Sequence, residues 1–142
     1  MKFLILHGPN LNLLGSREPD VYGYETLDEL NNWLRENPQL AGNELIFYQS
    51  NHEGDIIDCL HKYRGQVDGA AINPGAYTHY SFSIRDAISS IDYPVVEVHL
   101  SDIHNREEFR KFSVIADACV KQISGKGKQG YLEALLFLKD SA

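Results

Sequence analysis

Hydrophobic positions along the chain alternate between two periods from one end to the other. Short apolar runs bounded by turn residues predict buried strands, and longer stretches with apolar residues three and four apart predict amphipathic helices. The predicted strands are Lys2–Leu6, Glu44–Gln49, Gly69–Asn73, Pro94–Leu100 and Ala118–Ile123. The predicted helices are one that begins after Thr26, then Glu53–Tyr63, Thr78–Ile91, the short Arg106–Phe112, and Gly130–Lys139.

Capping residues mark two of the predicted helix starts. Thr26 is followed three residues later by Glu29, which is the spacing of a capping box. Asn51 lies two residues before Glu53, where we expect its side chain to cap the second helix. The polar segment Gly8–Glu25 has no regular pattern, and long loops of this kind are often functional lids.

The order of elements predicts the fold. Five alternations of strand and helix predict an α/β, flavodoxin-like three-layer domain with a five-stranded parallel sheet of order 2-1-3-4-5. The length suits one core, so residues 1–142 are expected to form a single catalytic domain. Such sheets bind ligands beyond the carboxyl ends of their strands. The unusual polar clusters fall in those segments, at Gly8–Tyr24, Ser50–His52, Asn73–His79 and His99–Asp102.

The net charge of the chain bears on which classes of partner it binds. There are 13 Lys and Arg against 20 Asp and Glu, a formal net charge of −7, which argues against nucleic acid and acidic membranes. A small anionic substrate would need a local group of Arg side chains and backbone N–H donors.

The sequence shows no clear targeting pattern and no cysteine motif. No apolar run is long enough to span a bilayer, and Met1–Leu6 reads as a strand rather than a signal peptide, so a cytoplasmic location is expected. Cys59 and Cys119 have no metal-like spacing and are expected to be buried thiols rather than a disulfide or a catalytic pair.

Arg17 and Tyr22 are the first candidates for chemistry. They lie in a loop with flanking glycines that would serve as hinges for closure. A neighbouring guanidinium favours the phenolate and lowers the pKa of a tyrosine hydroxyl from its usual value of about 10. A phenolate is suited to act as a general base toward a carbon acid. The competing interpretation is a solvated loop, which composition alone favours.

Glu97 and His99 are the second pair. They alternate with Val96 and Val98 at the end of a strand, where ionisable groups are costly to bury unless paired or used. His99 has the residue type of a general acid at neutral pH, and Glu97 would orient it or a water. The alternative is a structural histidine.

Further polar residues surround this edge of the predicted sheet. Asn73 and nearby N–H groups would hold hydroxyls or a carboxylate, and His79 would face the crevice. Arg106 and Arg110 are four residues apart, so on a helix they would share a face and one would reach an anion. A solvated charged helix is the equally good alternative.

Several nucleotide and metal signatures are missing from the sequence. There is no GxGxxG after a strand, no P-loop, and no pair of His residues in zinc spacing with carboxylates. No Lys lies inside the four loop clusters, which disfavours Schiff-base chemistry. The residues alone therefore favour proton abstraction next to a carbonyl followed by loss of a leaving group, without naming the substrate.

Five motifs, in order and in register, resemble those of the type II 3-dehydroquinate dehydratases. They are GPNLNLLGSREPDVYG, QSNHEGDIID, NPGAYTHYS, VEVHLSD and GYLEAL, and with the length they match across nearly the whole chain. The resemblance implies a cofactor-free, metal-free hydro-lyase that converts 3-dehydroquinate to 3-dehydroshikimate by anti elimination through an enolate. It implies a homododecamer, a tetramer of trimers, that serves aromatic biosynthesis or alternatively quinate breakdown.

The resemblance also assigns catalytic roles. Tyr22 would remove the proton from C2, Arg17 would lower the pKa of Tyr22, and His99 would protonate the departing C1 hydroxyl. Asn10 would hold a water that stabilises the enolate, and Glu97 would support His99. The implied substrate-binding groups are Asn73 with the backbone of Leu100 and Ser101 for the carboxylate, His79 and Arg110 for ring hydroxyls, and Asp86 from a neighbouring subunit.

One residue departs from the family pattern. The motif usually ends His-Leu-Ser-Asn, whereas Asp102 takes the last place here. Asp adds negative charge near a carboxylate pocket, and at a helix start it is also a good cap. Two other classes of function stay open on the residues alone: a non-catalytic binding protein that kept the pocket, and a metal-dependent hydrolase that uses several of the histidines.

Overall fold

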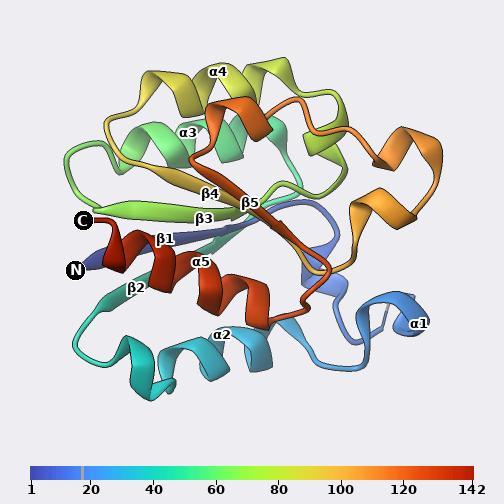
Figure 1. The fold of residues 1–142 in the computed structure, drawn as a ribbon, viewed down its shortest axis with the longest axis horizontal. Helices are drawn as coiled ribbons and strands as arrows, with labels where there is room; N and C mark the ends of the chain where they lie inside the picture. The colour runs from blue at the N-terminus through green and yellow to red at the C-terminus, as the bar shows by residue number, and fades with distance from the viewer. Residues whose placement is uncertain (17) are drawn as a thin grey trace.

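The computed structural model describes residues 1–16 and 18–142, and for Tyr22 the backbone alone. Five parallel strands form one sheet of order β2-β1-β3-β4-β5 (Figure 1). The strands are β1 (Lys2–His7), β2 (Glu44–Gln49), β3 (Gly69–Asn73), β4 (Val95–His99) and β5 (Lys121–Ser124). The predicted flavodoxin-like α/β class and strand order are therefore confirmed.

Helices cover both faces of the sheet. α2 (Leu27–Arg35) and α5 (Gln129–Asp140) lie on one face, and α3 (Glu53–Lys62) and α4 (Phe82–Ser90) lie on the other (Figure 1). Alternate residues of β1 face opposite ways, as in any strand. Phe3 and Ile5 pack into the core under α2 and α5, and Leu4 and Leu6 pack into the core under α3 and α4.

The start of α2 matches its sequence signal. The Thr26 hydroxyl accepts a hydrogen bond from the Glu29 backbone N–H at 3.2 Å, and the Glu29 carboxylate accepts one from the Thr26 backbone N–H. This reciprocal pair satisfies two N–H groups that a helix end leaves without partners. The predicted capping box is confirmed.

Two other predicted helices are wrong in extent. The stretch predicted as Thr78–Ile91 is divided into the 3₁₀ helix η3 (Gly75–His79) and α4. The Ser81 hydroxyl accepts from the Ile84 backbone N–H at 3.0 Å, so α4 is capped and begins four residues later than expected.

The stretch predicted as a helix, Arg106–Phe112, holds only the short 3₁₀ helix η5 (Glu108–Arg110), and another, η4 (Ile103–Asn105), precedes it. Arg106 between them is extended, with φ −107° and ψ −163°. The Asp102 carboxylate accepts from the His104 backbone N–H at 3.0 Å and from the Asn105 side chain at 2.7 Å. This cap begins η4. The helical conformation does not continue through Arg106.

Smaller differences concern element ends. β5 begins at Lys121 because Ala118 belongs to the 3₁₀ helix η6 (Ala116–Ala118). α3 is preceded by His52 without a side-chain cap, so the expected Asn51 cap is wrong. The Asn51 carboxamide oxygen instead accepts from the Asn10 backbone N–H at 2.9 Å. Three short helices complete the elements: η1 (Leu11–Leu13), α1 (Pro19–Tyr22) and η2 (Pro38–Leu40).

Two glycines let the loops after β1 and β3 approach closely. A Cβ on Gly8 would lie 2.7 Å from the Pro74 carbonyl carbon and 2.8 Å from the Asn73 oxygen. Gly75 has φ +59°, and its Cβ would lie 3.2 Å from the Pro9 oxygen. The Gly8 N–H donates to the Asn73 carbonyl at 2.7 Å, so the two loops are joined through their backbones.

Both cysteines are free thiols, as expected. Burial raises the pKa of Cys59 to about 11 and the pKa of Cys119 to about 12. Cys59 is buried, whereas Cys119 is only partly buried. None of the helices in the described part of the chain combines the length and apolar character that a membrane crossing requires.

Candidate active site

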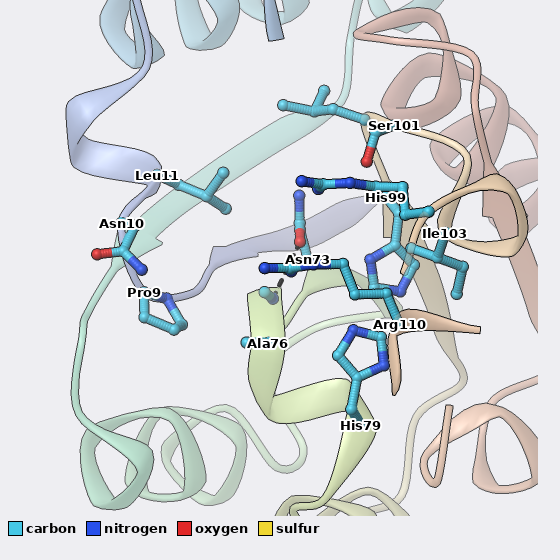
Figure 2. Close-up of a pocket in the computed structure, with 13 residues that line it drawn as sticks. Pro9, Asn10, Leu11, Asn73, Ala76, His79, His99, Ser101, Ile103 and Arg110 are labelled. Atoms are coloured by element: carbon cyan, nitrogen blue, oxygen red, sulfur yellow. Dashed lines mark hydrogen bonds between the residues drawn. The ribbon is translucent and has the colours of Figure 1, made fainter. Parts of the chain in front are cut away.

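A cavity of about 100 Å³ opens beyond the carboxyl ends of β1, β3 and β4. It lies where the fold class predicts a ligand site, and three of the four polar clusters contribute to its wall. Figure 2 shows His79, His99 and Arg110 on one side of it, Asn10 and Leu11 on the other, and Asn73 between them. The lining residues are Pro9, Asn10, Leu11, Asn73, Gly75, Ala76, His79, His99, Leu100, Ser101, Ile103, Arg106 and Arg110.

A buried histidine–carboxylate pair forms one end of the cavity wall. Glu97 and His99 lie on the same face of β4, with exposed fractions of 0% and 5%. His99 Nε2 lies 2.5 Å from Glu97 Oε2, and the other ring nitrogen has no hydrogen-bond partner among the described residues. The pair therefore presents Nδ1 of His99 as the group available to a ligand.

The Glu97 carboxylate is held ionised. Burial alone would raise the pKa of Glu97, but the hydrogen bond and charge of His99, with hydrogen bonds from Thr78 and Ser113, outweigh it and lower the pKa. The Thr78 hydroxyl donates at 2.5 Å and the Ser113 hydroxyl at 2.8 Å. A buried carboxylate with three donors is held in one position and fixes the orientation of the His99 ring.

His79 is oriented by the backbone. Nδ1 lies 2.6 Å from the Phe112 carbonyl, which can only accept, so Nδ1 carries the proton. Burial lowers the pKa of His79, with the Phe112 carbonyl acting in the opposite direction. The neutral ring therefore offers Nε2 as an acceptor for a ligand hydroxyl. The edge of the ring packs on Phe109, with centroids 6.1 Å apart.

Two arginines supply the positive charge of the cavity. Arg110 is paired with Glu107 and lies over the Phe109 ring, 4.7 Å from its centroid. Arg106 lies 3.7 Å from Glu18, a residue of the loop before α1. Both side chains line the cavity although they do not share a helix face as predicted.

Asn10 and Asn73 place amide groups on one side and in the middle of the cavity wall (Figure 2). Asn10 adopts the left-handed conformation, φ 70°, which asparagine tolerates better than most residues. The Asn73 side-chain oxygen accepts from the Gly75 backbone N–H at 3.1 Å. Beyond β4, the carbonyls of Leu100 and Ser101 accept from the loop after β5, which fixes the peptide groups that line the cavity there.

The other predicted residues fall into two groups. Arg17 is outside the described residues, and so is the side chain of Tyr22, whose backbone ends α1. Asp86 is exposed on α4 and does not line the cavity. Asp102 also lies off the wall, because its carboxylate caps η4.

Sequence reasoning missed the support for Glu97. Thr78 was expected only at a helix start, and Ser113 lies in an irregular segment with no pattern that marks it. Thr78 and Ser113 reach Glu97 on β4 only once the chain has folded.

Among the described residues, no three His, Cys, Asp or Glu side chains converge as ligands for a metal ion.

Sequence comparisons connect nearly the whole chain to one family. The family model described as "Dehydroquinase class II" matches residues 1–139. The 3-dehydroquinate dehydratase of Bacillus pumilus is 55% identical over 136 residues, 96% of this chain and 92% of the relative. That of Desulfitobacterium hafniense strain Y51 is 56% identical over 134 residues, 94% of this chain and 92% of the relative.

Solved structures give the same result. The type II dehydroquinase of Butyrivibrio crossotus is 47% identical, with a TM-score of 0.95 over 98% of this chain and 97% of that structure. The type II dehydroquinase of Propionibacterium acnes is 36% identical, with a TM-score of 0.91 over 98% and 97%.

Proposed function

The chain belongs to the class II dehydroquinases and is a 3-dehydroquinate dehydratase, a hydro-lyase of the shikimate pathway; from this premise we propose that Tyr22 and His99 act as its base and acid. The observation that carries this proposal is the buried Glu97–His99 pair. His99 lines the cavity, and its Nδ1 has no hydrogen-bond partner among the described residues. A protonated imidazole beside an ionised carboxylate is a suitable proton donor near neutral pH.

The reaction proceeds by anti elimination through an enolate. The Tyr22 phenolate takes the proton from C2, and the electrons move toward the neighbouring carbonyl oxygen. The C1–oxygen bond then breaks as His99 Nδ1–H gives its proton to the departing hydroxyl, which leaves as water. Arg17 lowers the pKa of Tyr22, and Asn10 holds a water that stabilises the enolate oxygen. The lining position of Asn10 supports the last role.

The rest of the cavity holds the substrate. Asn73 with the backbone of Leu100 and Ser101 binds the carboxylate, and the two Arg side chains favour an anion against the net charge of −7. His79 and Arg110 bind ring hydroxyls, which the acceptor Nε2 of His79 supports. No cofactor enters any of these steps.

The test of this mechanism is an absorbance assay. The protein is incubated with 3-dehydroquinate and EDTA while the ultraviolet absorbance of the conjugated enone product is followed. A parallel sample is treated with substrate and borohydride, freed of both by dialysis because borohydride also reduces the substrate ketone, and then assayed with fresh substrate. We expect undiminished enone growth in both assays, since neither a metal nor an imine takes part. Loss of turnover with EDTA and its return with zinc would contradict the mechanism, as would inactivation by borohydride together with substrate.

We further propose that the chain works in the cytoplasm, as a single catalytic domain in a homododecamer built as a tetramer of trimers. An aromatic patch supports the assembly: Tyr80, Phe82, Phe109 and Phe112 are all exposed on the segments around η3 and η5, which pack together. Exposed apolar groups of this size usually mark an interface. Asp86, exposed on α4, would reach the cavity of a neighbouring copy.

Light scattering tests the assembly. We expect a mass twelve times that of the 16.1 kDa chain, and smaller species for Phe112→Glu, because that change places a charge in the aromatic patch. Val120→Glu is the matched control, since Val120 is exposed at the opposite end of the strands, just before β5. A monomeric wild-type chain would contradict the proposal and the role of Asp86.

A further inference from the structure

The polar cluster Ser50–His52, which follows β2, is the one of the four predicted clusters that does not line the cavity. β2 is the outer strand of the sheet and pairs with β1 as far as His7 and Gln49. The carboxyl end of β2 therefore lies beside the loop after β1, which carries Asn10. Hydrogen bonds from Gln49 and Asn51 join these two segments.

The direction of each of these hydrogen bonds is fixed by a backbone group. The Asn10 backbone N–H can only donate, so the atom of the Asn51 amide that lies 2.9 Å from it is the oxygen. The Gly8 carbonyl can only accept, so the atom of the Gln49 amide that lies 3.2 Å from it is the nitrogen. The same nitrogen donates to the Asn51 oxygen at 3.2 Å. The Asn51 oxygen thus has two donors that hold it toward the loop after β1.

The backbone of Asn51 is held from a third segment. The Tyr77 hydroxyl donates to the Asn51 carbonyl at 3.0 Å. Tyr77 belongs to η3, which also carries Ala76 and His79, two residues of the cavity wall. The acceptor for the Asn10 N–H is therefore set by the loops after β2 and β3 together, although Asn51 itself is exposed.

Asn10 needs such support because of its backbone conformation. It precedes η1 with φ 70° and ψ −5°, a left-handed conformation that costs free energy for a residue with a Cβ. An asparagine at a helix start commonly caps the helix with its side chain, but Asn10 makes no such bond. Its side chain lines the cavity instead, while its N–H is bonded to Asn51.

We propose that Asn51 is a positioning residue whose side-chain oxygen holds Asn10 in the left-handed conformation, so that the Asn10 amide stays in the cavity wall. This inference rests on the proposed role of Asn10, which holds the water that stabilises the enolate oxygen. Gln49 contributes by orienting the Asn51 amide. Both residues act on the reaction through Asn10, because neither lines the cavity.

The first test is Asn51→Ala, which removes the acceptor. We expect kcat for 3-dehydroquinate to fall on the order of tenfold, the effect of one hydrogen bond, with KM within about twofold of wild type. The loss falls on kcat because Asn10 acts on the enolate rather than on the bound substrate. Both constants are measured from the growth of enone absorbance.

Asn37→Ala is the matched control. The Asn37 side-chain oxygen also accepts from a backbone N–H next to a 3₁₀ helix, that of Gln39 at 3.0 Å, and Asn37 does not line the cavity. This substitution should leave kcat and KM unchanged. A merely structural role for Asn51 would make the two variants alike.

A second variant acts on the same link without changing Asn51. Gln49→Met keeps the length of the side chain and removes the amide nitrogen, so the Asn51 oxygen loses one of its two donors. We expect a smaller loss of kcat, about threefold, again with little change in KM.

A double-mutant cycle separates this inference from the proposed function. If Asn51 acts through Asn10, Asn51→Ala should have no further effect on kcat in an Asn10→Ala background. A similar loss in both backgrounds, or kcat within twofold of wild type for Asn51→Ala, would overturn the positioning role. Wild-type kinetics for Asn10→Ala itself would instead overturn the proposed role of Asn10, so the two failures are distinguishable.

Discussion

His99→Gln is expected to lower kcat on the order of 10³-fold, with KM changed much less. Loss of a positioned general acid typically costs about 10²- to 10⁴-fold, and here the leaving hydroxyl would have to depart without a proton. Glutamine keeps a polar side chain of similar reach next to Glu97, so binding groups on the other walls are undisturbed. The rate is measured from the growth of enone absorbance at saturating substrate.

His104→Gln is the matched control for this prediction. His104 lies in η4, five residues further along, but it is exposed and does not line the cavity. Its substitution should leave kcat within about twofold of wild type, as for most surface changes. If His99→Gln also kept near-normal turnover, His99 would not be the acid, and the role of Glu97 would fall with it.

Glu97→Gln is expected to lower both turnover and stability. The amide has the shape of the carboxylate but brings an NH₂ group toward donors from Thr78, Ser113 and His99, and it removes the negative charge next to His99. We expect kcat to fall on the order of 10²-fold or more, as when a carboxylate that orients a catalytic histidine is lost. The free energy of unfolding should fall by about 3 kcal/mol, because one partner of a buried pair is removed.

The pH dependence gives this prediction a second readout. The pKa of Glu97 in the folded chain is below its ordinary value of 4.5, so its contribution to stability is present above pH 4.5 and is lost as the pH falls through the folded pKa. The difference in urea midpoint between wild type and Glu97→Gln should therefore shrink from pH 7 to pH 3. Glu133→Gln, which removes a surface ion pair with Lys126, should cost little at either pH. A constant difference across pH would show that Glu97 is not the group that titrates.

The sequence was sufficient for the sheet because its signals are local. Apolar runs such as Gly69–Asn73 and the capping box at Thr26 depend on neighbours a few residues away, and both were predicted to the residue. The same dependence on local signals explains why the limits of two helices were predicted wrongly. Ser81 and Asp102 are local caps, but the sequence offers several competing cap residues nearby, and tertiary packing decides among them.

The site divides in a similar way. Asn73, His79 and His99, which line the cavity, were predicted because the carboxyl ends of parallel strands converge by topology. The partners that tune them were not predicted. Ser113 reaches Glu97, the partner of His99, across 16 residues and Thr78 reaches it across 19, and no periodicity relates these positions. Their contacts exist only after the layers have packed.

The close approach of Gly8 and Gly75 also constrains how related sequences can be recombined. A side chain at Gly8 would collide with the backbone of residues 73 and 74, and one at Gly75 would press on Pro9. The loops after β1 and β3 must therefore come from the same parent sequence, although about 65 positions separate them in the chain. A chimaera that draws these two loops from parents with different backbone paths would break the cavity wall at Asn73, whereas one that inherits them together would preserve it.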